Sequence, residues 1–292
     1  DAPAMPVRGV MIDVSRTRVP TMQALFALVE DIAALKGNHL QLYTEHAFAY
    51  RGHEEAWRGS GAITPSEVRA LDAHARRFGV TLAANQNCFG HLARWLRLPK
   101  YQHLAETHGD WVFDVWPRSG PFSLCPVDPA SLDLVRDWLD QLLPCFSSGL
   151  VNIGCDETYD VGFGRSAEAV RARGRGAVYA EFVNKVAREA LARGSRPMFW
   201  SDIALHDPSC LTMLPRELIA LAWGYEPDTP FEAWLHTLRE AGLTSWVCPG
   251  TSSWRSILGR TRERTANLQS AASAGAGAQA AGMLVCDWGD TG

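Results

Sequence analysis

Two adjacent carboxylates, Asp156 and Glu157, stand directly after an apolar run at residues 150–154. A short apolar run of this kind predicts a buried strand, from which both acids would emerge together. Paired carboxyl groups can protonate a leaving oxygen and stabilise a cation that develops beside it. Because successive residues of a regular strand point to opposite faces, these two share a site only where the strand has broken into a loop.

Aromatic rings and polar groups follow other apolar runs in the same way. An isolated Trp is more often a core residue, and an adjacent Asp-Glu pair is more often a solvated corner, so no single member carries the argument. Their recurrence favours a sugar site, because pyranose faces stack on aromatic rings and hydroxyls need charged or bidentate hydrogen-bond partners. The residues that follow the runs are Asn85, Asn87, His91, Trp200, Asp202, Trp223, Tyr225, Glu226, Trp254, Trp288 and Asp290.

The elements that must position these residues alternate between short β-type runs and longer helical ones, which is the pattern of βα units around a parallel sheet. Eight units in 292 residues favour an α/β fold, a (β/α)8 TIM barrel, with an open doubly wound sheet as the alternative. In a barrel, the carboxyl ends of the strands meet at the active site. The expected strands are 7–14, 39–43, 80–85, 150–154, 197–200, 218–222, 245–247 and 283–286.

We expect a single catalytic barrel over residues 1–292. No stretch after the last expected strand can form the eighth helix, so we expect that helix to be missing and the chain to be a piece of a longer protein. Capping boxes with a leading proline predict helix starts at Thr64 and Thr229. The Ala- and Gly-rich stretch 271–281 is expected to be a weak helix ahead of the last strand.

Composition restricts the class of partner. A net charge of −4 with scattered Lys and Arg argues against nucleic acid and anionic membranes and favours a neutral or weakly polar small substrate. No apolar run approaches the ~20 residues of a membrane span. The seven Cys occur singly, with no CxxC pair and no zinc-site spacing, which predicts free thiols, no structural metal and a cytoplasmic location.

The sequence also resembles a known family, the family 20 glycoside hydrolases or β-N-acetylhexosaminidases, in motifs that follow the family's order through the whole chain. The fourth-strand motif His-x-Gly-Gly-Asp-Glu is matched at 152–157 by Asn-Ile-Gly-Cys-Asp-Glu, with Asn and Cys in place of His and Gly. The first-strand motif, which begins Arg-Gly and ends with Arg, is matched at 8–16. Further matches are Gly-His at 90–91, Trp-Gly-Asp at 288–290 and Leu-Gln-Leu-Tyr-Thr-Glu at 40–45.

The resemblance implies exo-acting, retaining removal of terminal GlcNAc or GalNAc, without cofactor or metal, through an oxazolinium ion formed by the substrate's own 2-acetamido oxygen. It implies that Glu157 is the acid and base and that Asp156 orients the acetamido N–H and stabilises the cation. Arg8 and Asp290 would lie side by side where the last strand meets the first, and would grip the sugar hydroxyls. The other implied substrate-binding residues are Glu45, His91 in support of the acid, Trp200, Trp223, Trp254 and Trp288 in the walls, and Tyr225 on the acetamido oxygen.

Two other functions remain open. A metal-dependent barrel hydrolase would use Asp13, His39, His46, His53 and Asp156, but no His-x-His pair ends the first strand and His39 falls inside an apolar run, where a hydrogen-bonded core His is expected. A sugar-binding protein without turnover would keep the aromatic cage but has no need of the intact acid pair. A chromogenic N-acetylglucosaminide assay separates the enzyme from the binding protein.

Overall fold

Eight parallel strands close into a barrel in a computed structural model that describes residues 2–290. Around the barrel the order is β1-β10-β9-β8-β7-β6-β3-β2. The predicted (β/α)8 TIM barrel is confirmed, and the open doubly wound sheet is wrong. The barrel strands are β1 (Val7–Asp13), β2 (His39–Tyr43), β3 (Thr81–Asn85), β6 (Leu150–Asn152), β7 (Arg196–Trp200), β8 (Ile219–Trp223), β9 (Thr244–Cys248) and β10 (Gly282–Asp287).

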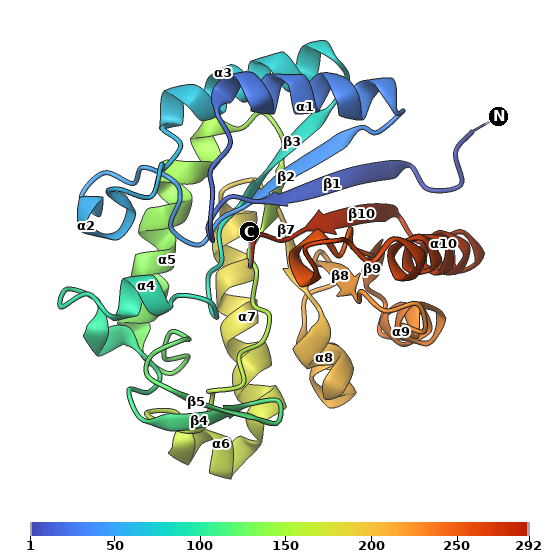
Figure 1. Ribbon diagram of the computed structural model, residues 1–292. Coiled ribbons are helices and arrows are strands. Elements are labelled where there is room, and N and C mark those ends of the chain that lie inside the picture. The colour runs from blue at the N-terminus through green and yellow to red at the C-terminus, as the bar shows by residue number, and fades with distance from the viewer. Residues whose placement is uncertain (1, 291–292) are drawn as a thin grey trace.

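Helices surround the barrel, with α1 and α3 on one side in Figure 1 and α9 and α10 on another. Helices α1, α3, α5, α7 and α9 each bury an apolar stripe, whereas α10 buries only Asn267, Ala271 and Gly275. No helix among residues 2–290 has the length and hydropathy to cross a membrane. The helices are α1 (Met22–Ala34), α2 (Glu54–Trp57), α3 (Pro65–Arg77), α4 (Ala93–Leu96), α5 (Pro129–Leu142), α6 (Ala167–Arg173), α7 (Arg175–Ala192), α8 (Asp202–His206), α9 (Phe231–Glu240) and α10 (Thr261–Gly277).

The two predicted capping boxes had different outcomes. Thr64 caps α3 through a capping box with Glu67, as predicted. The capping box predicted at Thr229 is wrong. The Thr229 hydroxyl donates to the Glu226 carbonyl at 2.8 Å, and α9 begins after Pro230 without a side-chain cap. The expected helix at 271–281 is confirmed up to residue 277, where α10 ends.

The interior of the barrel is a packed core. Its strands point large side chains inward, where they pack against one another. The seven Cys are all buried and unpaired, as expected for free thiols. The inward-facing side chains include Met11, Tyr43, Met198, Trp200, Trp246 and Leu284.

A small antiparallel hairpin lies outside the barrel, in the long connection between β3 and α5. It consists of β4 (Asp110–Phe113) and β5 (Trp116–Ser119), and it lies beside α6 in Figure 1. The sequence analysis predicted no strand here, because four-residue strands give too short a pattern to recognise. The connection follows the carboxyl end of β3, so it belongs to the end of the barrel at which barrel enzymes bind their substrates.

Candidate active site

A pocket of about 230 Å³ opens at the carboxyl ends of the strands. The residues around it come from the segments that follow six different strands, and they unite both ends of the chain. Part of the set that the sequence placed after the strands gathers here, whereas Asn85, Asn87, Trp200, Asp202 and Glu226 do not line the pocket. The lining consists of Arg16, His91, Asp156, Glu157, Trp223, Tyr225, Trp254, Arg255, Trp288 and Asp290.

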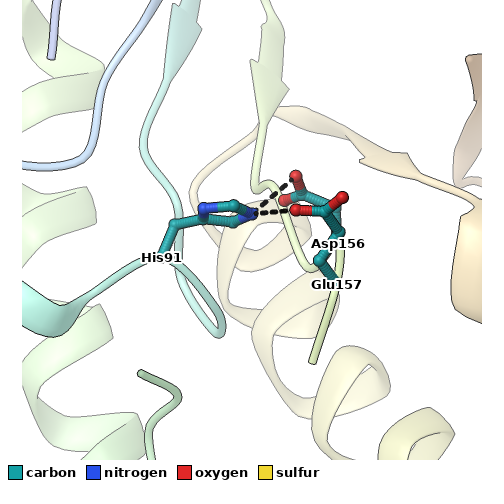
Figure 2. Close-up of side chains that lie close together, drawn as sticks. All are labelled: His91, Asp156 and Glu157. Carbon is teal, nitrogen blue, oxygen red and sulfur yellow. Dashed lines mark ion pairs between the residues drawn. The ribbon is translucent and has the colours of Figure 1, made fainter. Parts of the chain in front are cut away.

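Asp156 and Glu157 face the same pocket because β6 has already ended. The strand stops at Asn152, and Gly154, Cys155 and Glu157 then take positive φ angles of 70°, 72° and 52°. Positive φ is uncommon outside glycine, so this loop is held in a strained form. Figure 2 shows both carboxylates turned toward His91. One ring nitrogen of His91 and one carboxylate oxygen from each of Asp156 and Glu157 all lie within 4.8 Å of one another.

Buried side chains support this loop. The Asn152 side chain accepts the backbone N–H of Gly154 at 2.9 Å and donates to Gln41 at 3.0 Å. The Tyr179 hydroxyl donates to the Cys155 carbonyl at 3.0 Å. Asn152, which replaces the His of the family motif, therefore anchors the loop from inside the barrel and does not line the pocket.

His91 joins the two carboxylates. Its Nε2 lies 3.1 Å from Asp156 Oδ2 and 3.1 Å from Glu157 Oε2. Burial alone would lower the pKa of His91, but the Asp156 and Glu157 carboxylates raise it well above its ordinary value. Gly90 makes the approach possible, because a Cβ there would lie 2.6 Å from the Asp156 carbonyl oxygen. The His91 imidazole thus lies within ion-pair distance of both carboxylates.

Asp202 is a third carboxyl group of the site, and the sequence analysis gave it no role. It is half-buried at the start of α8, and its Oδ2 accepts the backbone N–H of Glu157 at 2.9 Å. Its Oδ1 accepts the indole N–H of Trp223 at 3.3 Å. Burial, followed by the charges of Asp156 and Glu157, raises the pKa of Asp202 well above its ordinary value. The sequence signal that could have pointed to Asp202 is its position two residues after Trp200, the last residue of β7.

Arg16 lines the pocket beside His91, with its Nη2 3.5 Å from His91 Nδ1. Its guanidinium lies 2.7 Å from Asp13, 3.4 Å from Glu45 and 2.9 Å from Asp290. It also lies over the Trp288 ring, 4.9 Å from the centroid. Glu45 does not line the pocket. It lies 3.4 Å from Arg16 Nη2 and 3.7 Å from His91 Nδ1, so it contacts both side chains from outside the pocket lining.

The expectation that Arg8 lies beside Asp290 is wrong. Arg8 is at the amino end of β1, and its side chain donates to the carbonyls of Met5, Pro6 and Lys36. The strand carries its first residues to the end of the barrel opposite the pocket, because all eight strands run parallel. Arg16, at the other end of the same motif, takes the predicted place.

Four aromatic side chains form the walls. Trp288 donates its indole N–H to the Tyr225 hydroxyl at 2.7 Å, and Tyr225 stacks on Trp223 at a centroid distance of 5.3 Å. Trp254 meets Tyr225 edge-on at 5.0 Å. Trp200 was also expected in the wall, which is wrong: it is fully buried in the barrel interior, 6.0 Å from the Trp288 ring.

Arg255 lines the pocket as well, although the sequence gave no signal for it. It lies over the Tyr225 ring at 5.7 Å and forms an ion pair with Glu226. Glu226 also binds Arg260 at 2.9 Å. These contacts bring the connection after β9 against the connection after β8, so Arg255 forms part of the pocket rim.

The ligand set of the metal-dependent alternative is not brought together. His39 is fully buried beside Gln41, and burial lowers its pKa to about 3. His53 is held between Tyr101 and Asp137 on the outer side of the barrel. Within residues 2–290, the one group with metal-ligand spacing is His91 with Asp156 and Glu157, which shares only Asp156 with that set.

Comparison with known proteins gives one consistent result. A model of the glycosyl hydrolase family 20 catalytic domain matches residues 5–249. Human hexosaminidase D is 25% identical over 218 residues, which cover 72% of this chain and 43% of that protein. A β-hexosaminidase of Emericella nidulans is 22% identical over 170 residues, 54% of this chain and 28% of its own length. The chain therefore spans less than two thirds of the curated relatives it matches.

Solved structures share the fold. An exo-β-N-acetylglucosaminidase from Vibrio harveyi, in complex with N-acetylglucosamine, superposes with a TM-score of 0.75 at 16% identity, over 99% of this chain and 51% of that one. A chitobiase from Flavobacterium johnsoniae gives a TM-score of 0.74 at 17% identity, over 98% and 45%. At these identities the likeness establishes the architecture of the barrel, and the chemistry must be argued from the side chains.

Proposed function

The chain belongs to glycosyl hydrolase family 20, and from that premise we propose that it is an exo-acting, retaining β-N-acetylhexosaminidase that removes terminal GlcNAc or GalNAc from glycoconjugates. The observation that carries the proposal is the joint orientation of Asp156 and Glu157 toward one aromatic-walled pocket, with His91 bound to both. An acid pair that served only the fold would not need to face a cavity.

The proposed reaction uses the substrate as its own nucleophile. The 2-acetamido oxygen attacks the anomeric carbon, and Glu157 donates a proton to the glycosidic oxygen as its bond to that carbon breaks. Asp156 accepts the acetamido N–H and stabilises the positive charge of the oxazolinium ion. Water then attacks the anomeric carbon, Glu157 takes its proton, and the acetamido group is restored with the configuration retained.

The remaining lining residues supply binding. The Arg16 fork donates to sugar hydroxyls and Asp290 accepts from them, which suits adjacent hydroxyls at the far end of a terminal sugar. Trp223, Trp254 and Trp288 pack on its apolar faces. The Tyr225 hydroxyl accepts the Trp288 N–H and would donate its own proton to the acetamido oxygen. A site closed in this way accepts a chain end and not a chain interior.

The test is hydrolysis of 4-nitrophenyl N-acetyl-β-glucosaminide and the matching galactosaminide by the wild-type chain and by Glu157→Gln. We expect release of nitrophenol by the wild type, with the β-anomer of the free sugar appearing first in the proton NMR spectrum. First appearance of the α-anomer would contradict retention. Binding of N-acetylglucosamine without any hydrolysis would instead make the chain a sugar-binding protein.

A further inference from the structure

We propose that the β4–β5 hairpin carries a binding platform for the sugar on the leaving side of the scissile bond, formed by Phe113, Trp116 and Tyr159. This inference rests on the proposed function and deepens it, because it assigns a sugar as the leaving group. The pocket described above holds the terminal sugar only. The leaving-side sugar must lie outside it, on the side of the acid that protonates the bond between the two rings.

Tyr159 is the first link between the acid and the hairpin. Its backbone N–H donates to the Glu157 carbonyl at 2.7 Å, which keeps the two residues within one tight turn. The Tyr159 ring meets the Phe113 ring edge-on, with centroids 5.0 Å apart. Burial, and then the charges of Asp202, Glu157 and Asp114, raise the pKa of Tyr159. The tip of the hairpin therefore lies beside the ring that follows the acid.

Phe122 is the second link, and it fixes the hairpin to the catalytic pair. Its ring lies 4.7 Å from His91 and 5.2 Å from Trp111, the buried aromatic residue of β4. Its contact with Phe113 is longer, at 6.1 Å. A platform on this hairpin is thus held at a constant position relative to the acid, as a second sugar site requires.

Trp116 is the exposed ring of the platform and lies on the same face of the hairpin as Phe113. Trp116 pairs directly with Phe113, and directly paired residues of antiparallel strands point to the same face. Trp116 is 66% exposed, so its ring is open to a ligand. Arg118 lies over the Phe113 ring at 5.6 Å and offers donors beside it. An exposed ring next to a guanidinium is the combination that binds a pyranose face and its hydroxyls.

The two faces of the hairpin differ in their relation to the acid. The face of the platform is linked to Glu157 by the backbone hydrogen bond of Tyr159 and by the contact of the Tyr159 ring with Phe113. The opposite face of the same hairpin, which carries Val112, has no such connection to the acid, because neighbouring residues of a strand alternate between faces. Val112 therefore provides a matched control on the same element, at 41% exposure.

The experiment compares two substrates in the wild type and in Trp116→Ala, Trp116→Tyr and Val112→Ala. N,N′-diacetylchitobiose places a second sugar on the platform, whereas N-acetyl-β-glucosaminyl fluoride has a single-atom leaving group. For Trp116→Ala we expect kcat/KM to fall about 2- to 12-fold on the disaccharide, the worth of one aromatic stack, and to stay unchanged on the fluoride. Trp116→Tyr should retain most of the disaccharide activity, and Val112→Ala should change neither substrate.

Equal losses on both substrates would overturn the platform, because Trp116 would then act through the fold. An unchanged kcat/KM of Trp116→Ala on the disaccharide would also overturn the platform. So would a wild-type protein that cleaves the fluoride but does not cleave the disaccharide. Failure of the wild type on both substrates would overturn the proposed function itself. The thermal midpoint of Trp116→Ala should equal that of the wild type, since an exposed ring leaves no cavity when it is removed.

Discussion

Arg16 Nε lies 2.9 Å from Asp290 Oδ1, so the segment after β1 and the segment after β10 meet across the seam where the barrel closes. The same guanidinium contacts Asp13 and Glu45, which are buried more deeply than Asp290. Arg16 is thus bound from behind by two carboxylates and from the pocket side by a third. Of the three carboxylates, only Asp290 can give up its contact with Arg16 and bind a sugar hydroxyl instead.

Asp290→Asn should lower kcat/KM by about 10- to 100-fold, because an amide is a weaker acceptor for sugar hydroxyls than a carboxylate. The thermal midpoint should stay nearly unchanged, since the Asp290 side chain is 44% exposed and exposed ion pairs contribute little. Arg8→Ala is the matched control and should leave the kinetics unchanged. A large drop in the midpoint with intact kinetics in Asp290→Asn would contradict a role in sugar binding.

Glu157→Gln should reduce turnover most for substrates with a basic leaving oxygen. General acid catalysis is worth about 10² to 10⁴-fold, and it matters only where the leaving group needs a proton. We therefore expect a much larger loss on N,N′-diacetylchitobiose than on a 2,4-dinitrophenyl glycoside. Comparison of kcat/KM for the two substrates checks this. Equal losses would remove Glu157 from the role of acid.

Asp156→Asn should weaken the binding of a thiazoline analogue of the oxazolinium ion. The asparagine keeps the size of the side chain but loses its charge, and such an electrostatic contact is worth about 3 to 4 kcal/mol. Calorimetric titration of the wild type and the variant measures the difference. The mechanism in which the substrate supplies the nucleophile would be falsified if both proteins bound the analogue equally.

Asp202→Asn should lower turnover although Asp202 does not line the pocket. An asparagine offers one acceptor oxygen where two N–H groups, those of Glu157 and the Trp223 indole, now bind, and an unsatisfied buried donor costs about 1 to 3 kcal/mol. Asp160→Asn is the control, because Asp160 is a buried carboxylate that binds Ser123 without touching Glu157. We expect both variants to lose stability and only Asp202→Asn to lose kcat. Equal kcat values would leave Asp202 a purely structural role.

His91 should make stability depend on pH on the alkaline side. Its folded pKa is raised above the ordinary 6.5 by Asp156 and Glu157, against the effect of burial. The stability it contributes is therefore complete below the unfolded pKa and is lost as the pH rises through the folded pKa. The difference in thermal midpoint between the wild type and His91→Asn, measured between about pH 6 and pH 10, should shrink as the pH rises. A constant difference would mean that His91 stays neutral.

The alternation of apolar runs was enough to predict the barrel and to place the acid pair at the end of a strand. It succeeded because each strand is a local pattern, and because parallel strands bring all their carboxyl ends to one side of the fold. The position of Asp156 and Glu157 after residues 150–154 follows from that pattern alone. So does the gathering of Trp223, Tyr225 and Trp288 around one pocket.

The same reasoning failed to predict which side chains lie in the pocket, because that depends on contacts between residues far apart in the sequence. Arg8 and Arg16 belong to one motif, and the rule that barrel sites lie at the carboxyl ends of the strands already favours Arg16, but the contact of Arg16 with Asp290 comes from the closing of the barrel. Trp200 and Trp223 both end strands, and only the packing of the barrel interior decides which one a ligand can touch.

The sequence placed Asp202 after a strand but gave no sign of its bond to the Glu157 backbone, and the β4–β5 hairpin gave no usable pattern, because strands of four residues have no recognisable period. The sequence by itself determined the kind of fold and the kind of chemistry. The tertiary structure decided which side chains meet, because closing the barrel brings together residues that the chain holds far apart.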